Sequence, residues 1–311
     1  MKLFGRGAGD PFSRKRVPRI IIKTITKTMQ KRVIAVHDIS CVGRCSITVA
    51  LPVISAAGIE CSIIPTALLS THTGGFEGYT FLPLTEEMEK ITAHLKTLAR
   101  PADTVYTGYL GSPDQVGAAR SVIEGLLRDG GVAVVDPVMG DAGRLYSGFD
   151  MRMVEAMREL CAHAAVIIPN ITEASFLLGR ECPDGLPMPG AETEELLRAL
   201  CGLGAPSAVL TGVYSEDGRI GAAYYDSRTG EIGYEFSEKH PGFYHGTGDV
   251  FGSSLTSALT LGSSLREATR IAVHFTERVV RRTAAADDDT RYGPVFEPEL
   301  GWLAGRMTEI K

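Results

Sequence analysis

The sequence has a single tryptophan and lacks any long hydrophobic run. No apolar stretch approaches the roughly 18–20 residues that a membrane-spanning helix needs, so no such helix is expected. The 35 glycines follow no three-residue repeat, which excludes a collagen-like chain. With 311 residues, of which 44% are hydrophobic and 22% charged, the chain has the composition of a globular protein with a sizeable core.

Cysteine is infrequent and shows no metal-binding spacing. None of the six cysteines forms a Cys-x-x-Cys pair, and Cys41 and Cys45 lack the second pair of ligands that a zinc site needs. Free thiols in a reducing environment are therefore expected, which predicts a cytoplasmic protein.

Basic residues are concentrated at the N-terminus. The formal net charge is −5, yet residues 1–32 hold ten Lys or Arg and a single acid, Asp10. The rest of the chain is therefore strongly acidic, which disfavours nucleic-acid binding because phosphate contacts need a dense basic face. We expect neither a nucleic-acid nor a membrane partner.

The basic segment over residues 1–31 is expected to be a disordered extension. It lacks the apolar core of a secretory signal, because Ile20–Ile22 is followed directly by Lys23. A transit peptide, a nucleic-acid tail and an extension before a natural start at Met29 are the alternatives, and we favour the last. No linker long enough to separate two domains follows, so residues 32–311 are expected to form one domain.

Short β-branched runs alternate with longer amphipathic stretches, which is the pattern of parallel strands joined by helices. The expected strands are 33–36, 61–65, 104–107, 132–136, 165–168 and 208–211. The expected helices are 46–57, 86–99, 114–128, 150–162, 173–178, 192–202, 249–261 and 265–282. Residues 222–225 and 233–236 predict an antiparallel hairpin, and 182–190 a surface loop. The fold predicted is a three-layer α/β/α sandwich with a mostly parallel central sheet and an antiparallel edge hairpin.

Polar or glycine-rich segments follow the first five expected strands. Ligands of open parallel sheets bind beyond the carboxyl ends of the strands, so these segments are expected to meet on one face. They are residues 37–40, 66–78, 107–109, 136–141 and 169–173.

The segment from His245 to Gly252 reads HGTGDVFG. Gly246 and Gly248 bracket Thr247 just before a helix, so successive backbone N–H groups can form a nest for an anion. Asp249, in the first turn, could accept a proton from an attacking hydroxyl. Alternatively, Asp249 only stabilises the helix dipole and the glycines belong to an ordinary loop.

Two other nucleotide motifs are missing. The glycine spacing G-x-G-x-x-x-G is one residue longer than the dinucleotide fingerprint and lies near the C-terminus, and no G-x-x-x-x-G-K-[ST] occurs. Both the dehydrogenase and the P-loop interpretations therefore lose most of their support.

Three further segments each have a structural and a functional interpretation. Asn170 and Glu173 fit a capping box, or Glu173 could hold a hydrated Mg²⁺ near nucleotide phosphates. Asp136 and Asp141 bracket a Pro and a Gly at a strand end, as a plain turn also would. The hydroxyl- and glycine-rich loop around His72 could cover a substrate, or His72 could be an ordinary capping or exposed histidine.

Taken together, the chain from about Arg32 to Leu300 resembles the pyridoxal/pyridoxamine kinase branch of the ribokinase-like superfamily. Five segments occur in the family's order and at compatible spacings. They are STHTGGF at 70–76, TGYLGS at 107–112, DPVMGD at 136–141, Pro169-Asn170 with Glu173, and GTGD at 246–249.

The resemblance implies ATP-dependent phosphorylation of the 5′-hydroxymethyl group of a vitamin B6 ring by a ribokinase-like domain. Asp249 would be the base, and the backbone of Gly246, Thr247 and Gly248 the anion hole. Asp136 and Glu173 would lie near Mg²⁺, Asn170 near Mg²⁺ and the triphosphate, and Thr211 with Gly212 near the nucleotide. The ring would be contacted by Asp38, Thr66, His72 and Tyr109. The resemblance also suggests a homodimer and leaves dependence on a monovalent cation open.

One departure concerns the ring. Many pyridoxal kinases carry a Gln-Ser-His type segment after the first strand, whereas this chain has His37-Asp38-Ile39-Ser40, with an acid as in hydroxymethylpyrimidine kinases. A hydroxymethylpyrimidine kinase of thiamine synthesis is therefore the nearest alternative. A noncatalytic B6- or nucleotide-binding sensor on the same fold is a more distant one.

Overall fold

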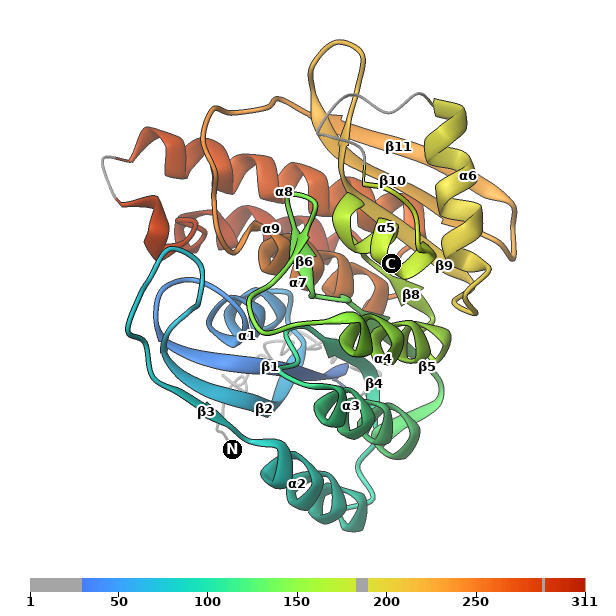
Figure 1. Cartoon of the computed structure of the whole chain (residues 1–311). Coiled ribbons are helices and arrows are strands. Elements are labelled where there is room, and N and C mark those ends of the chain that lie inside the picture. The colour runs from blue at the N-terminus through green and yellow to red at the C-terminus, as the bar shows by residue number, and fades with distance from the viewer. Residues whose placement is uncertain (1–29, 183–189, 287–288, 311) are drawn as a thin grey trace, which may run out of the picture.

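The computed structural model describes residues 30–182, 190–286 and 289–310; the basic segment up to residue 29 and most of the expected 182–190 loop lie outside this part. Its main sheet has the strand order β11-β10-β9-β8-β5-β4-β1-β2-β3 (Figure 1). The strands are β1 (Arg32–Val42), β2 (Glu60–Thr71), β3 (Phe81–Pro83), β4 (Ala102–Thr107), β5 (Leu127–Val135), β8 (Val166–Ile167), β9 (Ser207–Tyr214), β10 (Ile220–Asp226) and β11 (Glu231–Ser237). A separate small hairpin joins β6 (Gly140–Asp141) and β7 (Arg144–Leu145).

The predicted sheet topology is confirmed. The six central strands from β2 to β9 pair in parallel, whereas β10 is antiparallel to both β9 and β11. The other edge also ends in an antiparallel strand, because the short β3 runs against β2.

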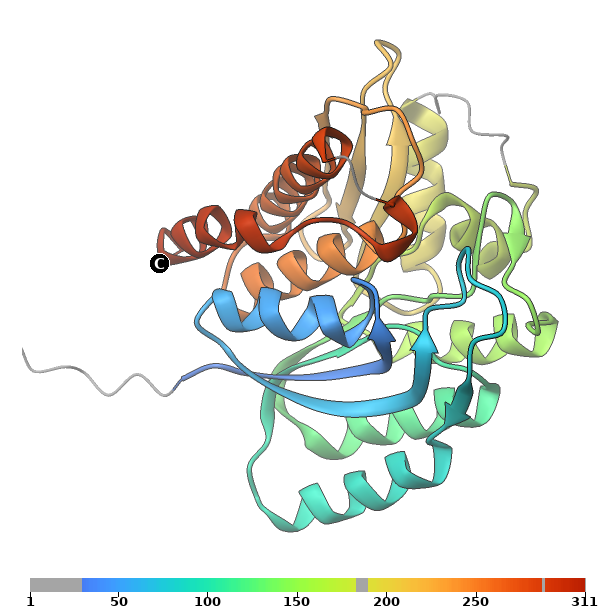
Figure 2. The ribbon, with the colours of Figure 1, turned by 90° about the vertical axis from the view of Figure 1, so that its left-hand side faces the viewer.

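Helices cover both faces of the sheet. They are α1 (Ile47–Ala56), α2 (Thr85–Thr97), α3 (Pro113–Leu126), α4 (Met151–Ala162), α5 (Ile171–Leu178), α6 (Gly190–Cys201), α7 (Thr247–Thr260), α8 (Leu265–Ala285) and α9 (Leu300–Thr308). Figure 2 shows α1, α7 and α8 on one side of the strands and α2, α3 and α4 on the other. None of the helices in these ranges is both long and apolar enough to cross a membrane.

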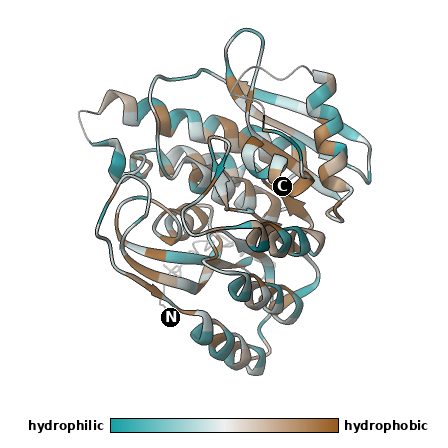
Figure 3. Cartoon of the chain, viewed as in Figure 1, coloured by the Kyte–Doolittle hydropathy of each residue, from teal (hydrophilic) through white to brown (hydrophobic). Residues whose placement is uncertain are grey.

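Strand alternation builds the two cores between these layers. Ile34 and Val36 face the layer of α2 to α6, whereas Val33 and Ala35 face α1, α7, α8 and α9. Figure 3 shows hydrophobic colour along the inner strands, and both hydrophobic and hydrophilic colour on the helices that cover them. All eight expected helices are present, and their ends lie within three residues of the expected positions.

The first two strands are longer than the sequence predicted. Beyond a register shift between His37 and Ile39, β1 and β2 continue to pair as far as Val42 and Thr71. The segment 37–40 therefore lies inside β1, and the expected loop over 66–78 starts only after Thr71. Strand β3, the β6–β7 hairpin and α9 were not predicted; Leu303 and Met307 of α9 are buried against the second core.

Candidate active site

Asp249 lies in the first turn of α7, as its motif predicted, and faces the connection between β1 and α1. Its Oδ2 accepts a hydrogen bond of 2.8 Å from the Ser46 N–H, and its Oδ1 lies 3.9 Å from Nδ1 of His37. Burial raises the pKa of Asp249 to about 7, an effect that the Ser46 N–H opposes and the charge of Asp38 reinforces. A carboxyl group that titrates near neutral pH is suited to general-base chemistry.

The two glycines before Asp249 differ in whether the fold requires a glycine at their position. Gly246 adopts φ +83° and precedes the first helical residue, Thr247; a Cβ atom there would lie 2.3 Å from the carbonyl oxygen of Arg44. Only glycine fits that position. A Cβ atom on Gly248 would meet nothing within 4 Å, so the helix start is open on that side. An open N-terminal turn offers its backbone N–H groups and dipole to an anion.

Asp136 and Glu173 form an acidic group near Asp249. Asp136 follows β5 and is buried, and its pKa is raised well above the ordinary value by burial and by the charges of Glu173 and Asp249. Burial raises the pKa of Glu173 to about 8. Carboxylates crowded in this way are stabilised by a divalent cation, and oxygen ligands are those that Mg²⁺ prefers.

The Asn170–Glu173 capping box is present. Glu173 Oε2 accepts a 2.8 Å hydrogen bond from the Asn170 N–H, and Asn170 Oδ1 accepts one of 2.8 Å from the Glu173 N–H. Glu173 Oε1 also accepts from the Met139 N–H at 3.2 Å, and Asn170 Nδ2 donates to the carbonyl of Gly140 at 2.9 Å. The structural interpretation of this motif is therefore confirmed, and its role toward Mg²⁺ and ATP stays a prediction.

The predicted nucleotide residues adjoin this cap. Thr211 forms a parallel bridge with Asn170, and its N–H donates to the carbonyl of Pro169 at 2.9 Å. Gly212 has φ +73° where the β9–β10 register shifts, and no atom lies within 4 Å of the position of a Cβ. The backbone there is thus exposed to an approaching ligand without a side chain in between.

The predicted ring-binding residues lie at the other end of the site. Asp38 is buried, and burial raises its pKa although Ser40 donates to its Oδ2 at 3.1 Å. Tyr109 stacks on Phe149 with ring centroids 5.8 Å apart. Burial and the charge of Asp38 raise the pKa of Tyr109 to about 12. An aromatic wall beside a buried acid suits a flat, polar ring.

Thr66 and His72 bind other parts of the protein in this structure. The hydroxyl of Thr66 donates to the carbonyl of Tyr109 at 3.0 Å. His72 Nδ1 accepts from the Gly74 N–H at 3.1 Å, and its Nε2 lies 2.6 Å from the carbonyl of Arg291. The accepting Nδ1 assigns the proton to Nε2. His72 therefore fastens the loop after β2 to residues 290–292, and direct contact with a substrate stays a prediction.

Sequence reasoning missed the groups that surround Asp249. Ser46, which donates to its carboxylate, is 203 residues away in sequence and has a positive φ of 50° that no motif announced. His37 was considered only as part of a segment. Arg44 was not considered, although its carbonyl closes the space beside both Gly246 and Gly293. These contacts could be predicted only by knowing which loops meet in space.

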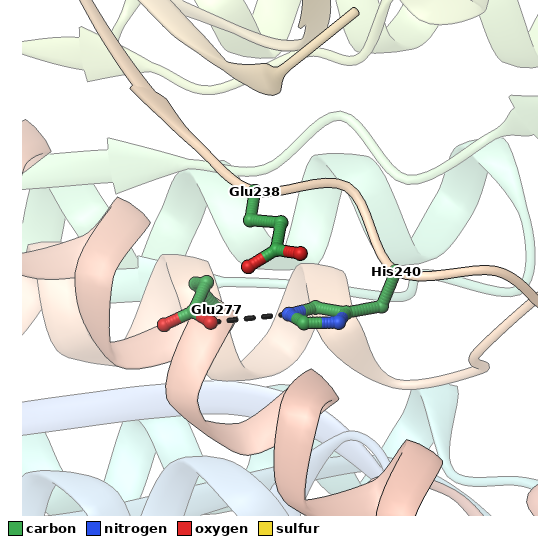
Figure 4. Close-up of side chains that lie close together, drawn as sticks. All are labelled: Glu238, His240 and Glu277. Carbon is green, nitrogen blue, oxygen red and sulfur yellow. Dashed lines mark hydrogen bonds and ion pairs between the residues drawn. The ribbon is translucent and has the colours of Figure 1, made fainter.

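A second group of possible metal ligands lies on α8 and the β11–α7 connection. Ligand atoms of Glu238, His240 and Glu277 all lie within 4.8 Å of one another, and Figure 4 shows His240 joined to Glu277. The His240 Nε2 to Glu277 Oε1 distance is 3.1 Å, and Arg281 also pairs with Glu277 at 3.3 Å. These contacts account for Glu277 without a metal ion.

A mostly parallel sheet with an antiparallel hairpin at one edge and helices on both faces is the architecture of ribokinase-like proteins. The chain belongs to the phosphomethylpyrimidine kinase family, whose pattern matches residues 46–295.

Relatives and solved structures agree with that assignment. A Bacteroides thetaiotaomicron protein described as a phosphomethylpyrimidine kinase, solved with pyridoxal, has a TM-score of 0.83 and 38% identity, covering 88% of this chain and 96% of that one. The pyridoxal kinase of Leishmania donovani, solved with ADP and pyridoxamine, has a TM-score of 0.75 and 25% identity, with 88% and 96% covered. The pyridoxine/pyridoxal/pyridoxamine kinase of Bordetella bronchiseptica is 30% identical over 78% of this chain and 86% of its own length.

Other matched relatives are longer proteins. The chain spans 35% to 47% of the length of the thiamine-biosynthesis enzymes of Oryza sativa, Geobacter sulfurreducens and Corynebacterium glutamicum, at 27% to 28% identity.

The glycine geometry gives a test of the helix start. We expect Gly246→Ala to lower the free energy of unfolding by about 1–2 kcal/mol or more, because a left-handed residue with a Cβ costs that much before its contact with the Arg44 carbonyl is counted. Gly248→Ala is the matched control and should leave stability within about 1 kcal/mol, since its Cβ meets open space. Urea unfolding measures both. Equal stability of the two variants would contradict the packing argument.

Proposed function

We propose that this protein is an ATP-dependent kinase that phosphorylates the 5′-hydroxymethyl group of pyridoxal, pyridoxamine or pyridoxine. The observation that carries the proposal is Asp249, a partly buried carboxyl group with a pKa of about 7 in the first turn of α7, where Gly246 and Gly248 flank Thr247. Solved relatives that hold pyridoxal, or ADP with pyridoxamine, support the same chemistry.

The reaction uses three parts of the site. Asp249 accepts the proton of the substrate alcohol as its oxygen attacks the γ-phosphoryl group of ATP. The backbone N–H groups of Gly246, Thr247 and Gly248 stabilise the charge on the transferred group. Tyr109 and Asp38 hold the ring, so that the alcohol is presented in line with the phosphoryl group.

Mg²⁺ fits the acidic group beside these residues. Asp136 has no hydrogen bond to its side chain among the residues that the structure describes. Burial, and then the charges of Glu173 and Asp249, raise its pKa, and a cation would relieve the repulsion between these charges. Asp136 would bind the ion directly. Glu173, whose oxygens already accept backbone N–H groups, would act through metal-bound water. When bound, the ion neutralises phosphate charge.

The wider setting of the enzyme is part of the proposal. Residues 32–311 act as one kinase domain in the cytoplasm, and two copies form a homodimer. Exposed apolar side chains on β2 and β3 support a dimer, since Leu68, Phe81 and Leu82 are 40%, 41% and 56% exposed.

Phosphorylation of the pyrimidine alcohol of thiamine synthesis is the second candidate. The family description and the buried Asp38 favour it. A buried acid in its protonated form can donate a hydrogen bond to a ring nitrogen, and both kinds of ring carry one.

A panel of acceptor alcohols tests the assignment. Purified protein with ATP and Mg²⁺ should phosphorylate at least one B6 vitamer with a kcat/KM at least about tenfold above that for hydroxymethylpyrimidine, a difference of about 1.4 kcal/mol in transition-state binding. The opposite ranking would establish the pyrimidine kinase. ATP binding without phosphorylation of any alcohol would identify a sensor.

Replacing the base should remove the chemical step while nucleotide binding persists. We expect wild-type kcat/KM to rise as the pH increases through about 7, where Asp249 becomes ionised. Asp249→Asn should lower kcat by about 10²-fold or more and abolish that rise, because general-base catalysis contributes on this scale. Steady-state rates and ATP titration of both proteins measure this. Asp114→Asn, an exposed change at the start of α3, serves as control. Near-normal turnover of folded Asp249→Asn would exclude the base assignment.

The substitution Glu173→Gln distinguishes the role of Glu173 in the helix cap from its proposed role toward Mg²⁺. Glutamine keeps an oxygen for the Asn170 N–H but loses the charge, so the Mg²⁺ concentration for half-maximal rate should rise by at least severalfold. Thermal unfolding of the same variant measures the stability lost when the cap is weakened. A lower melting temperature with unchanged Mg²⁺ dependence would leave Glu173 with a purely structural role.

A further inference from the structure

His37 is a buried histidine for which neither the fold nor the proposed reaction has yet supplied a role. It lies in β1 at the point where the β1–β2 register shifts, and it is only 1% exposed. Neither of its ring nitrogens has a hydrogen-bond partner among the described residues. A buried polar group without a partner is costly, so a role in another state of the protein is to be expected.

The ring occupies a place that its neighbours keep open. It packs edge-on against Tyr106 with ring centroids 4.5 Å apart. Gly108 supplies the remaining space, because a Cβ on that residue would lie 2.3 Å from His37 Nδ1. Burial lowers the pKa of His37 to about 3, so the imidazole is neutral and carries one N–H.

One ring nitrogen lies near the proposed base. His37 Nδ1 lies 3.9 Å from Oδ1 of Asp249, while Oδ2 of the same carboxylate is held by the Ser46 N–H. This distance is too long for a hydrogen bond, but contacts of catalytic groups commonly tighten once a substrate is bound. The other titratable groups whose charges interact with Asp249 are Asp38, Cys45, Tyr106, Asp136 and Tyr146.

We propose that His37 is a positioning residue for Asp249. Its neutral ring donates Nδ1–H to Oδ1 of the ionised carboxylate when the alcohol is in place, so that both carboxylate oxygens are fixed by a protein donor. Each carboxylate oxygen of Asp249 keeps a second lone pair that can accept the proton of the alcohol. The proton therefore passes to Asp249 and not to the imidazole. This inference rests on Asp249 being the base.

Two substitutions distinguish positioning from packing. His37→Leu fills the space without a donor, whereas His37→Asn places an amide N–H near the position of Nδ1. We expect His37→Leu to lower kcat about tenfold, the scale of one hydrogen bond to a charged group, with KM for ATP and for the alcohol changed less than about twofold. His37→Asn should recover most of that loss. Equal losses in both variants, or a normal kcat in His37→Leu, would overturn the proposal.

An observation on the unmodified protein covers the case in which His37→Leu does not fold. Nitrogen-15 NMR of histidine-labelled protein, with the His37 signals assigned by their absence in His37→Asn, should show the proton on Nδ1. A proton on Nε2 would leave no donor toward Asp249 and would refute the inference.

The base assignment is tested separately. If Asp249→Asn retains turnover, the base and the positioning role both fail. If Asp249→Asn loses turnover and His37→Leu does not, only the positioning role fails.

Discussion

The hydrogen bond from the Ser46 N–H to Asp249 joins two parts of the chain that are 203 residues apart. It brings the connection between β1 and α1 against the start of α7, and the rest of the site is arranged around that junction. Ser46 has a φ of 50°, an unfavourable backbone conformation for a residue with a side chain. Strain of this kind persists where the surrounding packing fixes the backbone, and it is found preferentially at functional sites. Here the strained residue is the one whose N–H donates to the carboxylate of Asp249.

Three carboxyl groups that raise one another's pKa or are held in buried surroundings meet at this site. Asp136 follows β5, Glu173 lies in the helix after β8, and Asp249 lies in the first turn of α7. The parallel topology brings these positions to the edge where the strands end. Burial and the other charges raise the pKa of Asp136, and burial is the main cause for the other two. A fold optimised only for stability would replace such a group by apolar residues. The proposed site, which would accept a proton and hold a cation beside phosphates, would use these properties.

The sequence was most informative where the physical cause is local. The helix expected from residue 249 is present but starts two residues earlier, at Thr247, so that Gly248 lies within its first turn. The Asn170–Glu173 cap follows from its spacing and is present. The length of β1 was underestimated because the strand continues past a register shift that depends on its pairing with β2. The contacts of Asp249 with Ser46 and His37 could not be predicted, since they depend on which distant loops meet. The roles of the predicted site residues rest on the resemblance and await the experiments.

Gly246 and Gly248 show how constraints of folding and of function can be separated within one motif. Gly246 is required by the protein itself, because its left-handed backbone passes against the Arg44 carbonyl. Gly248 is required by nothing in the fold: its backbone is helical and the space beside it is open. Glycine in a helical turn is destabilising relative to alanine by roughly 0.5–1 kcal/mol, so a glycine there has a cost that the fold does not repay. The proposed anion site would supply the missing reason, because a methyl group on this residue would occupy space beside the backbone where the phosphoryl group would bind.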